Sequence, residues 1–110
     1  MQLAIHNWMR AESLESTLKR ISALGYTHLE IQGAPEQYDT QEVKSLLEKY
    51  NIQCWGSVTL MLEDRNLLAK DPNQRKKSVQ YVLDLAKMVK DLAFGAKAIG
   101  VPVSTMIKGF

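Results

Sequence analysis

The stretch "THLEIQGAP" (residues 27–35) decides the fold, because it reads as a short strand that ends abruptly. Residues 27–32 are the strand candidate, and Gly33, Ala34 and Pro35 interrupt it. Similar candidates cover residues 2–6 and 52–58, so the three begin about 25 residues apart. A fourth candidate covers residues 96–103. Strands at such regular spacing predict one repeating unit.

A helix is expected between each strand and the next. Each helix has a residue suited to cap its start and another suited to end it, in the pairs Ser13 and Gly25, Asp39 and Asn51, Asp71 and Gly95. For the third helix we expect one buried face, made of Val79, Val82, Leu83, Ala86 and Val89. Alternating strands and helices predict right-handed crossovers and a parallel sheet.

Two architectures use this alternation. An open doubly wound sheet carries helices on both faces and often a glycine-rich phosphate loop after its first strand, whereas a closed barrel carries every helix outside. The segment "HNWMRAES" (residues 6–13) contains no glycine, which favours the barrel. We therefore predict an α/β fold in one domain, residues 1–110: a parallel (β/α) repeat that forms half of a TIM barrel, with about four strands and outer helices.

Four segments carry a resemblance to a known family: "GYTHLEIQG" (25–33), "NIQCWGSVTLM" (51–61), "EDRNLLAKDPNQR" (63–75) and "SVQYVLDLAKMVKDL" (78–92). Over residues 1–92 the chain resembles the xylose-isomerase-like TIM barrels, a group that includes sugar isomerases, epimerases and the endonuclease IV-type fold. The resemblance implies proton or hydride transfer between adjacent sugar carbons. It also implies a divalent metal, Mn²⁺, Mg²⁺, Co²⁺ or Zn²⁺, held by Glu, Asp and His at the barrel mouth.

The family takes those metal ligands largely from its second half. This chain ends at its fourth strand, and that strand offers no carboxylate or imidazole at its C-terminal end. We therefore expect no metal site and no cofactor in this chain, and a metal only in a full-length relative.

Composition excludes several other classes. The net charge of +2, with 24% charged residues, gives no concentrated basic footprint, so we expect no nucleic-acid partner. No apolar run reaches the length of a membrane span and no signal peptide is present, so we expect no membrane partner. Cys54 is the only cysteine and is expected to be buried, which favours a reducing cytoplasm.

The functional face of a parallel α/β fold lies at the C-terminal ends of its strands, which selects His6, Trp8 and Glu30 as substrate-binding candidates. His6 and Glu30 are polar residues in otherwise apolar strands, suited to contact a sugar hydroxyl or to transfer a proton, or else to form structural hydrogen bonds. Trp8 is suited to stack on a sugar ring, or else to pack between loop and barrel. Trp55 is expected in the core.

Arg65 is the fourth substrate-binding candidate, because it lies in the longest loop. Its guanidinium is suited to bind a phosphate or a sugar acid. The alternative is a local ion pair with Glu63 or Asp64.

The sequence thus predicts the N-terminal half of a sugar isomerase/epimerase-like barrel that contributes substrate-facing loops. Its partner would be a small sugar or sugar acid, and its catalytic residues are not assigned. Whether it is an enzyme stays open, and we expect the chain alone to be inactive. The alternatives are a non-catalytic α/β interaction module, a truncated product, and a flavodoxin-like open sheet. Unpaired sheet edges also predict a homo-oligomer.

Overall fold

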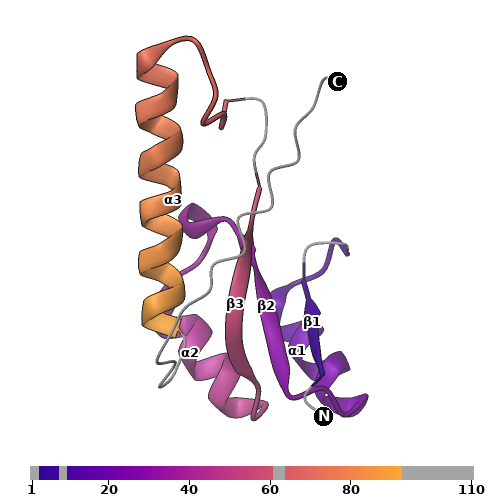
Figure 1. The fold of residues 1–110 in the computed structure, drawn as a ribbon. Coiled ribbons are helices and arrows are strands. Elements are labelled where there is room, and N and C mark those ends of the chain that lie inside the picture. Colours follow the sequence, from indigo (N-terminus) through magenta and orange to yellow (C-terminus); the bar gives the residue numbers. More distant parts are fainter. Residues whose placement is uncertain (1–2, 8–9, 61–63, 93–110) are drawn as a thin grey trace.

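The computed structural model describes residues 3–7, 10–60 and 64–92 (Figure 1). Its elements follow in the order β1 (Ala4–His6), α1 (Leu14–Ala23), β2 (His28–Gly33), the 3-10 helix η1 (Pro35–Gln37), α2 (Thr40–Lys49), β3 (Gln53–Thr59) and α3 (Pro72–Leu92). Three strand–helix units therefore stand where the sequence predicts them. The predicted fourth strand, residues 96–103, and Gly95 lie outside the described residues.

The three strands form one parallel sheet in the order β1-β2-β3. Each strand is added beside the previous one, as in a barrel, whereas a flavodoxin-like sheet places its first strand between the second and the third. The flavodoxin-like alternative is therefore wrong. The β2–β3 pairing shifts between Leu29 and Glu30, whose partners are Cys54 and Gly56, so Trp55 is skipped in the register.

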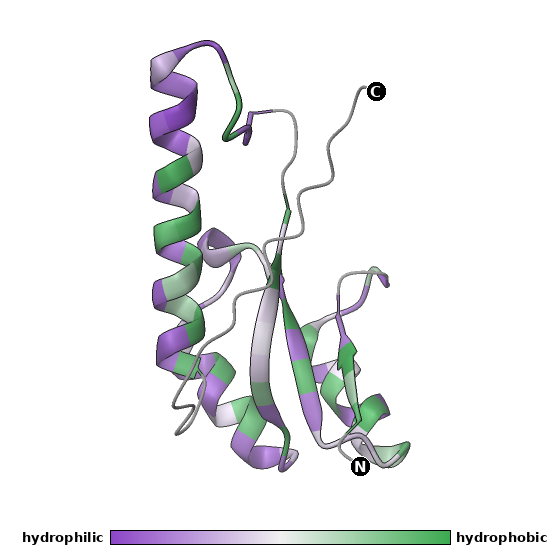
Figure 2. Ribbon diagram, in the orientation of Figure 1, coloured by the Kyte–Doolittle hydropathy of each residue, from purple (hydrophilic) through white to green (hydrophobic). Residues whose placement is uncertain are grey.

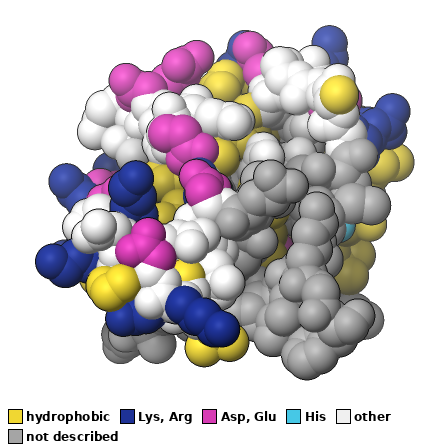
Figure 3. Space-filling view, turned by 90° about the horizontal axis from the view of Figure 1, so that it is seen from above, with side chains coloured by type: hydrophobic (Ala, Val, Ile, Leu, Met, Phe, Trp, Pro, Cys, Tyr) yellow, Lys and Arg dark blue, Asp and Glu magenta, His cyan; other side chains and the backbone are white. Residues whose placement is uncertain are grey.

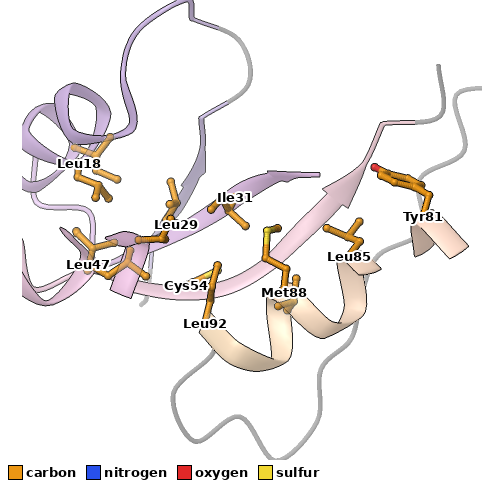
Figure 4. Packing of buried hydrophobic residues seen from close by; sticks show 13 residues of the cluster. Leu18, Leu29, Ile31, Leu47, Cys54, Tyr81, Leu85, Met88 and Leu92 are labelled. Carbon is orange, nitrogen blue, oxygen red and sulfur yellow. The ribbon is translucent and has the colours of Figure 1, made fainter. Parts of the chain in front are cut away.

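The core lies on one face of this sheet. Leu29 and Ile31 of β2 and Cys54 of β3 are buried there against all three helices (Figure 4). The helices contribute Leu18 and Ile21 from α1, Val43 and Leu47 from α2, and Tyr81, Leu85, Met88, Val89 and Leu92 from α3. Each fully buried Leu or Ile contributes about 1.5–3 kcal/mol. Because a single cluster takes residues from every helix, the helices cover the same face, and the barrel-type (β/α) prediction is confirmed.

The predicted ends of α1 and α2 are confirmed. The Ser13 side chain accepts a hydrogen bond from Ser16 N at 3.1 Å and caps α1. Asp39 Oδ1 accepts two hydrogen bonds from the first turn of α2, at 2.9 and 3.1 Å. Gly25 and Asn51 have φ angles of 86° and 51°. These left-handed conformations let the chain turn from each helix into the next strand.

The predicted buried face of α3 is confirmed for Val89, which is buried, and for Val82, which packs against the core, but it is wrong for Val79 and Leu83. Val79 and Leu83 are 49% and 57% exposed, while Tyr81, Leu85 and Met88 enter the core. The helix carries two apolar stripes, and only one of them meets the sheet, because its orientation follows from tertiary packing. Figure 2 shows the hydrophilic start of α3 and the hydrophobic residues that follow it. None of the described helices is long and apolar enough to cross a membrane.

Trp55 and Cys54 lie next to each other in β3 but differ in environment. Cys54 is buried as predicted, and burial raises the pKa of its thiol to about 11. Trp55 is 44% exposed, so the prediction that it packs in the core is wrong. The register shift at this position and the alternation of side chains along a strand place Trp55 on the face away from the helices.

Candidate functional site at the C-terminal ends of the strands

His6 and Glu30 are brought together on the open face of the sheet. They are register partners in the β1–β2 pair, and both are partly buried. Their neighbours Ile5, Leu29 and Ile31 pack into the core, so strand alternation turns His6 and Glu30 away from the helices. An imidazole and a carboxylate thus lie side by side where a barrel would have its interior. Their contact with a sugar stays a prediction.

A polar network that the sequence did not predict joins the ends of β1 and β2. Asn7 Oδ1 accepts a hydrogen bond from Gln32 N at 2.7 Å. Asn7 Nδ2 donates to Tyr38 Oη at 3.1 Å, and Tyr38 Oη donates to Gln32 Oε1 at 3.3 Å. Burial raises the pKa of the Tyr38 hydroxyl, which therefore stays protonated and able to donate at neutral pH. The network fixes the two amide side chains at the mouth.

This network forms one wall of a pocket of about 440 Å³. The pocket is lined by Asn7, Arg10, Ala11, Glu12, Leu14, Gln32, Gln37 and Tyr38. Figure 3 looks onto this end of the molecule, where Lys and Arg side chains are interspersed with Asp and Glu. A pocket of this size holds a small polar ligand.

Glu12 in this pocket is already paired. Its Oε1 accepts hydrogen bonds from Arg20 Nη2 at 2.6 Å and from Thr17 Oγ1 at 3.0 Å. The Arg20 hydrogen bond, more than any other contact, holds the pKa of Glu12 below its usual value. Arg20 Nε is buried and has no hydrogen-bond partner among the described residues. The Arg20 residue also lines an adjoining cavity of about 90 Å³, together with His6 and Arg10.

The ends of β2 and β3 are held by a different tyrosine. Tyr81 Oη of α3 donates to the Gly33 carbonyl at 2.5 Å and accepts from Leu60 N at 2.8 Å. A Cβ on Gly33 would lie 2.0 Å from the Val58 carbonyl oxygen and 2.9 Å from Tyr81 Oη. Only glycine fits at this end of β2, because the backbone of β3 and the Tyr81 hydroxyl both come so close to it.

Arg65 adds to this arrangement and, with Glu36 and Tyr81, lines a pocket of about 540 Å³. Its guanidinium stacks on the Tyr81 ring at 3.9 Å, donates to the Leu60 carbonyl at 3.2 Å and pairs with Glu36 at 3.0 Å. The ion pair is therefore made with a residue 29 positions earlier, and not with the adjacent Asp64. Glu63 lies outside the described residues. The substrate role of Arg65 stays a prediction, and a substrate there would compete with these contacts.

Trp8 lies outside the described residues, so its predicted stacking role stays a prediction. Among the described side chains, no three of His, Cys, Asp and Glu lie close enough together to hold a metal ion. The family's divalent metal therefore does not fit the residues that the structure describes, and we derive no step through it.

Tyr38 and Tyr81 are the residues that sequence reasoning missed. Tyr38 lies in the segment that follows β2, and this position after the C-terminal end of a strand was the one sequence signal that could have marked it as a site residue. Tyr81 sits within α3, where an aromatic residue is read as core. Each tyrosine acts through its hydroxyl group, whose partners lie 6 to 48 residues away in the sequence.

Three parallel strands in sequential order, with every helix on one face, define part of a (β/α) barrel. The sequence matches no protein-family model and no curated protein. Solved structures do match the fold. The chain is similar to a D-psicose 3-epimerase from Clostridium cellulolyticum H10 determined with D-tagatose, with a TM-score of 0.66 and 24% identity. It is also similar to a D-psicose 3-epimerase determined in the presence of D-fructose, with a TM-score of 0.67 and 15% identity.

Both likenesses cover 84% of this chain and 34% of the epimerase chain. The chain thus spans about a third of the length of these epimerases. The predicted resemblance to xylose-isomerase-like TIM barrels is confirmed at the level of the fold.

Proposed function

We propose that this chain is the sugar-facing part of a sugar isomerase/epimerase-like barrel. The observation that carries the proposal is the pairing of His6 with Glu30 on the open face of the sheet. The fold likeness to two epimerases whose structures were determined with ketoses supports it. His6 and Glu30 would contact the sugar, with Trp8 as a further candidate.

The chemistry of these side chains suits a sugar. A sugar hydroxyl both donates and accepts hydrogen bonds, a carboxylate accepts them, and a neutral imidazole does both. Either group is also able to transfer a proton at a sugar carbon. We assign no catalytic residue. Any divalent metal, Mn²⁺, Mg²⁺, Co²⁺ or Zn²⁺, would be held by residues beyond those described, as expected of a full-length relative.

Ligand binding to the full chain tests the proposal. Titration of D-psicose, D-tagatose and D-fructose, followed by amide NMR shifts, should give saturable changes at β1 and β2. His6→Ala and Glu30→Gln should each weaken binding about tenfold, because each removes a hydrogen bond from a partly enclosed site. His28→Gln is the matched control, because His28 lies at the N-terminal end of β2, the strand that carries Glu30. Absent shifts, or equal affinity in all three variants, would contradict the proposal.

The second candidate is a non-catalytic α/β interaction module or a truncated product. It is favoured by the lack of a three-ligand cluster among residues 3–7, 10–60 and 64–92. Melting curves with and without Mn²⁺ or Mg²⁺, together with an epimerisation assay on a ketose panel, separate the two. If the chain is such a module, Mn²⁺ and Mg²⁺ should leave its melting temperature unchanged and no ketose should be epimerised. Metal-dependent turnover would reject this candidate.

We also propose self-association through the sheet edges. Within the described residues, β1 and β3 each pair on one side, and a second copy would cover the exposed edges. Size-exclusion chromatography with light scattering should give a mass above that of one chain. A well-folded monomer would contradict this.

We propose a cytoplasmic location, because the sole cysteine is a buried thiol. The interspersed charges of Figure 3 favour a small-molecule partner over nucleic acid. Fractionation of cells that express the tagged chain checks the location, and recovery from an extracellular fraction would contradict it.

A further inference from the structure

The pocket beside the Asn7–Gln32–Tyr38 network has more free donors than free acceptors. Asn7 Oδ1 accepts from Gln32 N, and Gln32 Oε1 accepts from Tyr38 Oη. Glu12 Oε1 accepts from both Arg20 and Thr17. Most acceptor oxygens of the lining are therefore satisfied within the protein.

The donors that remain are cationic or amide groups. Arg10 lines the pocket, and no carboxylate among the described residues forms an ion pair with its guanidinium. Arg20 lines the adjoining cavity with Arg10, Asn7 and Glu12, and its buried Nε has no hydrogen-bond partner in the described part of the chain. The Gln32 amide nitrogen has no partner among these residues either, since its oxygen alone serves the network. The pocket and the adjoining cavity together are lined by two guanidinium groups, of Arg10 and Arg20, and by one carboxylate, that of Glu12, on which both arginines act.

We infer that this pocket binds an oxyanion, the carboxylate or phosphate group of an acidic sugar, with Arg10 as its main charged contact. An oxyanion supplies only acceptors, which matches a lining whose remaining polar atoms are donors. Glu12 does not oppose it strongly, because the Arg20 guanidinium lies 2.6 Å from its carboxylate.

The same ligand chemistry was predicted for Arg65, and the structure points instead to Arg10. Arg65 already contacts Glu36, the Leu60 carbonyl and the Tyr81 ring. An anion there would have to displace a carboxylate and a carbonyl. An anion at Arg10 displaces neither, so the cost of binding is lower at Arg10.

The sugar part of this inference rests on the proposed function, whereas the oxyanion part does not. The test is calorimetric titration of the full chain with four probes: inorganic phosphate, D-fructose, D-fructose 6-phosphate and D-glucuronate. We expect at least one acidic sugar to bind about tenfold more tightly than D-fructose, since charge-assisted hydrogen bonds are about twice as strong as neutral ones. Comparison of the phosphorylated with the carboxylated sugar shows which oxyanion the pocket takes.

Arg10→Gln should reduce acidic-sugar affinity about tenfold or more and leave D-fructose affinity unchanged. Arg10→Lys should retain part of the affinity, because it keeps the charge but loses the two-pronged geometry. Lys76→Gln is the control for net charge, since Lys76 lies exposed on α3 away from the pocket lining. Arg10 is itself exposed, so its variants should keep the melting temperature of the parent.

The outcomes separate the inference from the proposed function. Equal affinity for acidic and neutral sugars, or an Arg10→Gln affinity equal to the parent's, overturns the inference even if D-fructose binds through His6 and Glu30. Phosphate binding that depends on Arg10, without any sugar binding, supports the oxyanion site and overturns the proposed function.

Discussion

The two neighbouring pairs of strand ends in this sheet differ in how their polar groups are paired. At the β2–β3 end, the Tyr81 hydroxyl bonds to the backbone of Gly33 and Leu60, and Arg65 covers its ring. At the β1–β2 end, Asn7 and Tyr38 form a network that borders an open pocket.

The difference lies in what remains for a ligand. At the β2–β3 end, the Tyr81 hydroxyl and the Arg65 guanidinium bond within the protein and stabilise the fold, although both residues also line a pocket of about 540 Å³. The β1–β2 end leaves Arg10, Arg20 Nε and the Gln32 amide without full partners among the described residues. Binding is therefore expected between β1 and β2, and substitutions at the two ends should separate stability from binding.

Gly33→Ala should have the largest effect on stability. The new Cβ would meet the Val58 carbonyl oxygen at 2.0 Å, so β2, β3 or α3 has to move. We expect a loss of about 3 kcal/mol or more in the free energy of unfolding. Urea denaturation followed by circular dichroism measures it.

Gly25→Ala is the matched control. Gly25 has a φ of 86°, and no atom of the described residues lies within 4 Å of the position that the new methyl group would take, so the cost there is conformational alone. That cost is about 1 kcal/mol. Equal losses for the two variants would show that the close approach at Gly33 is not a packing constraint.

Tyr81→Phe should cost about 2 kcal/mol, because it leaves the Gly33 carbonyl and Leu60 N without their buried partner. Tyr38→Phe should cost about 1 kcal/mol, because its partners are side chains at a half-buried site that water can reach. Thermal melts of both variants check the order. A larger loss for Tyr38→Phe would contradict the expectation that the β2–β3 end contributes more to stability than the β1–β2 end.

Local signals made most of the fold predictable. Ser13, Asp39 and Asn51 act on residues within one helical turn, so their roles are visible in sequence. The regular spacing of the strands also predicted the parallel sheet, because each helix joins two consecutive strands of the chain. The buried stripe of α3 was not predictable, because Val79 and Leu83 are as apolar as the residues that do meet the sheet.

The candidate site was predictable in its position but not in its contacts. Strand ends selected His6 and Glu30, and the β1–β2 register does place them together. From the sequence we expected Arg65 to pair with Glu63 or Asp64, whereas in the structure it pairs with Glu36 of η1. Side-chain networks depend on distances across the sheet that no local pattern encodes.

Arg65→Gln should lower the free energy of unfolding by about 1 kcal/mol, because it removes the stacking on Tyr81 and the pair with Glu36. Arg10→Gln should leave it within about 0.5 kcal/mol of the parent, as expected for an exposed residue without such contacts. Urea midpoints of the two variants measure the difference. Equal midpoints would mean that the Arg65 contacts add nothing to the stability of the β2–β3 end.

Glu12→Gln should give the smallest effect, visible only as a change in pH dependence. The Arg20 hydrogen bond lowers the pKa of Glu12 from 4.5 in the folded state. The resulting stabilisation is present above pH 4.5 and is lost as the pH falls through the folded pKa, because the unfolded chain takes up the proton more readily. Melting temperatures between pH 7 and pH 3 should therefore fall less steeply for Glu12→Gln than for the parent. Glu48→Gln, at an exposed position of α2, should keep the parent's slope. A parental slope in Glu12→Gln would mean that the Glu12–Arg20 pair is as weak as an ordinary surface pair, and that Arg20 is not held at the pocket by it.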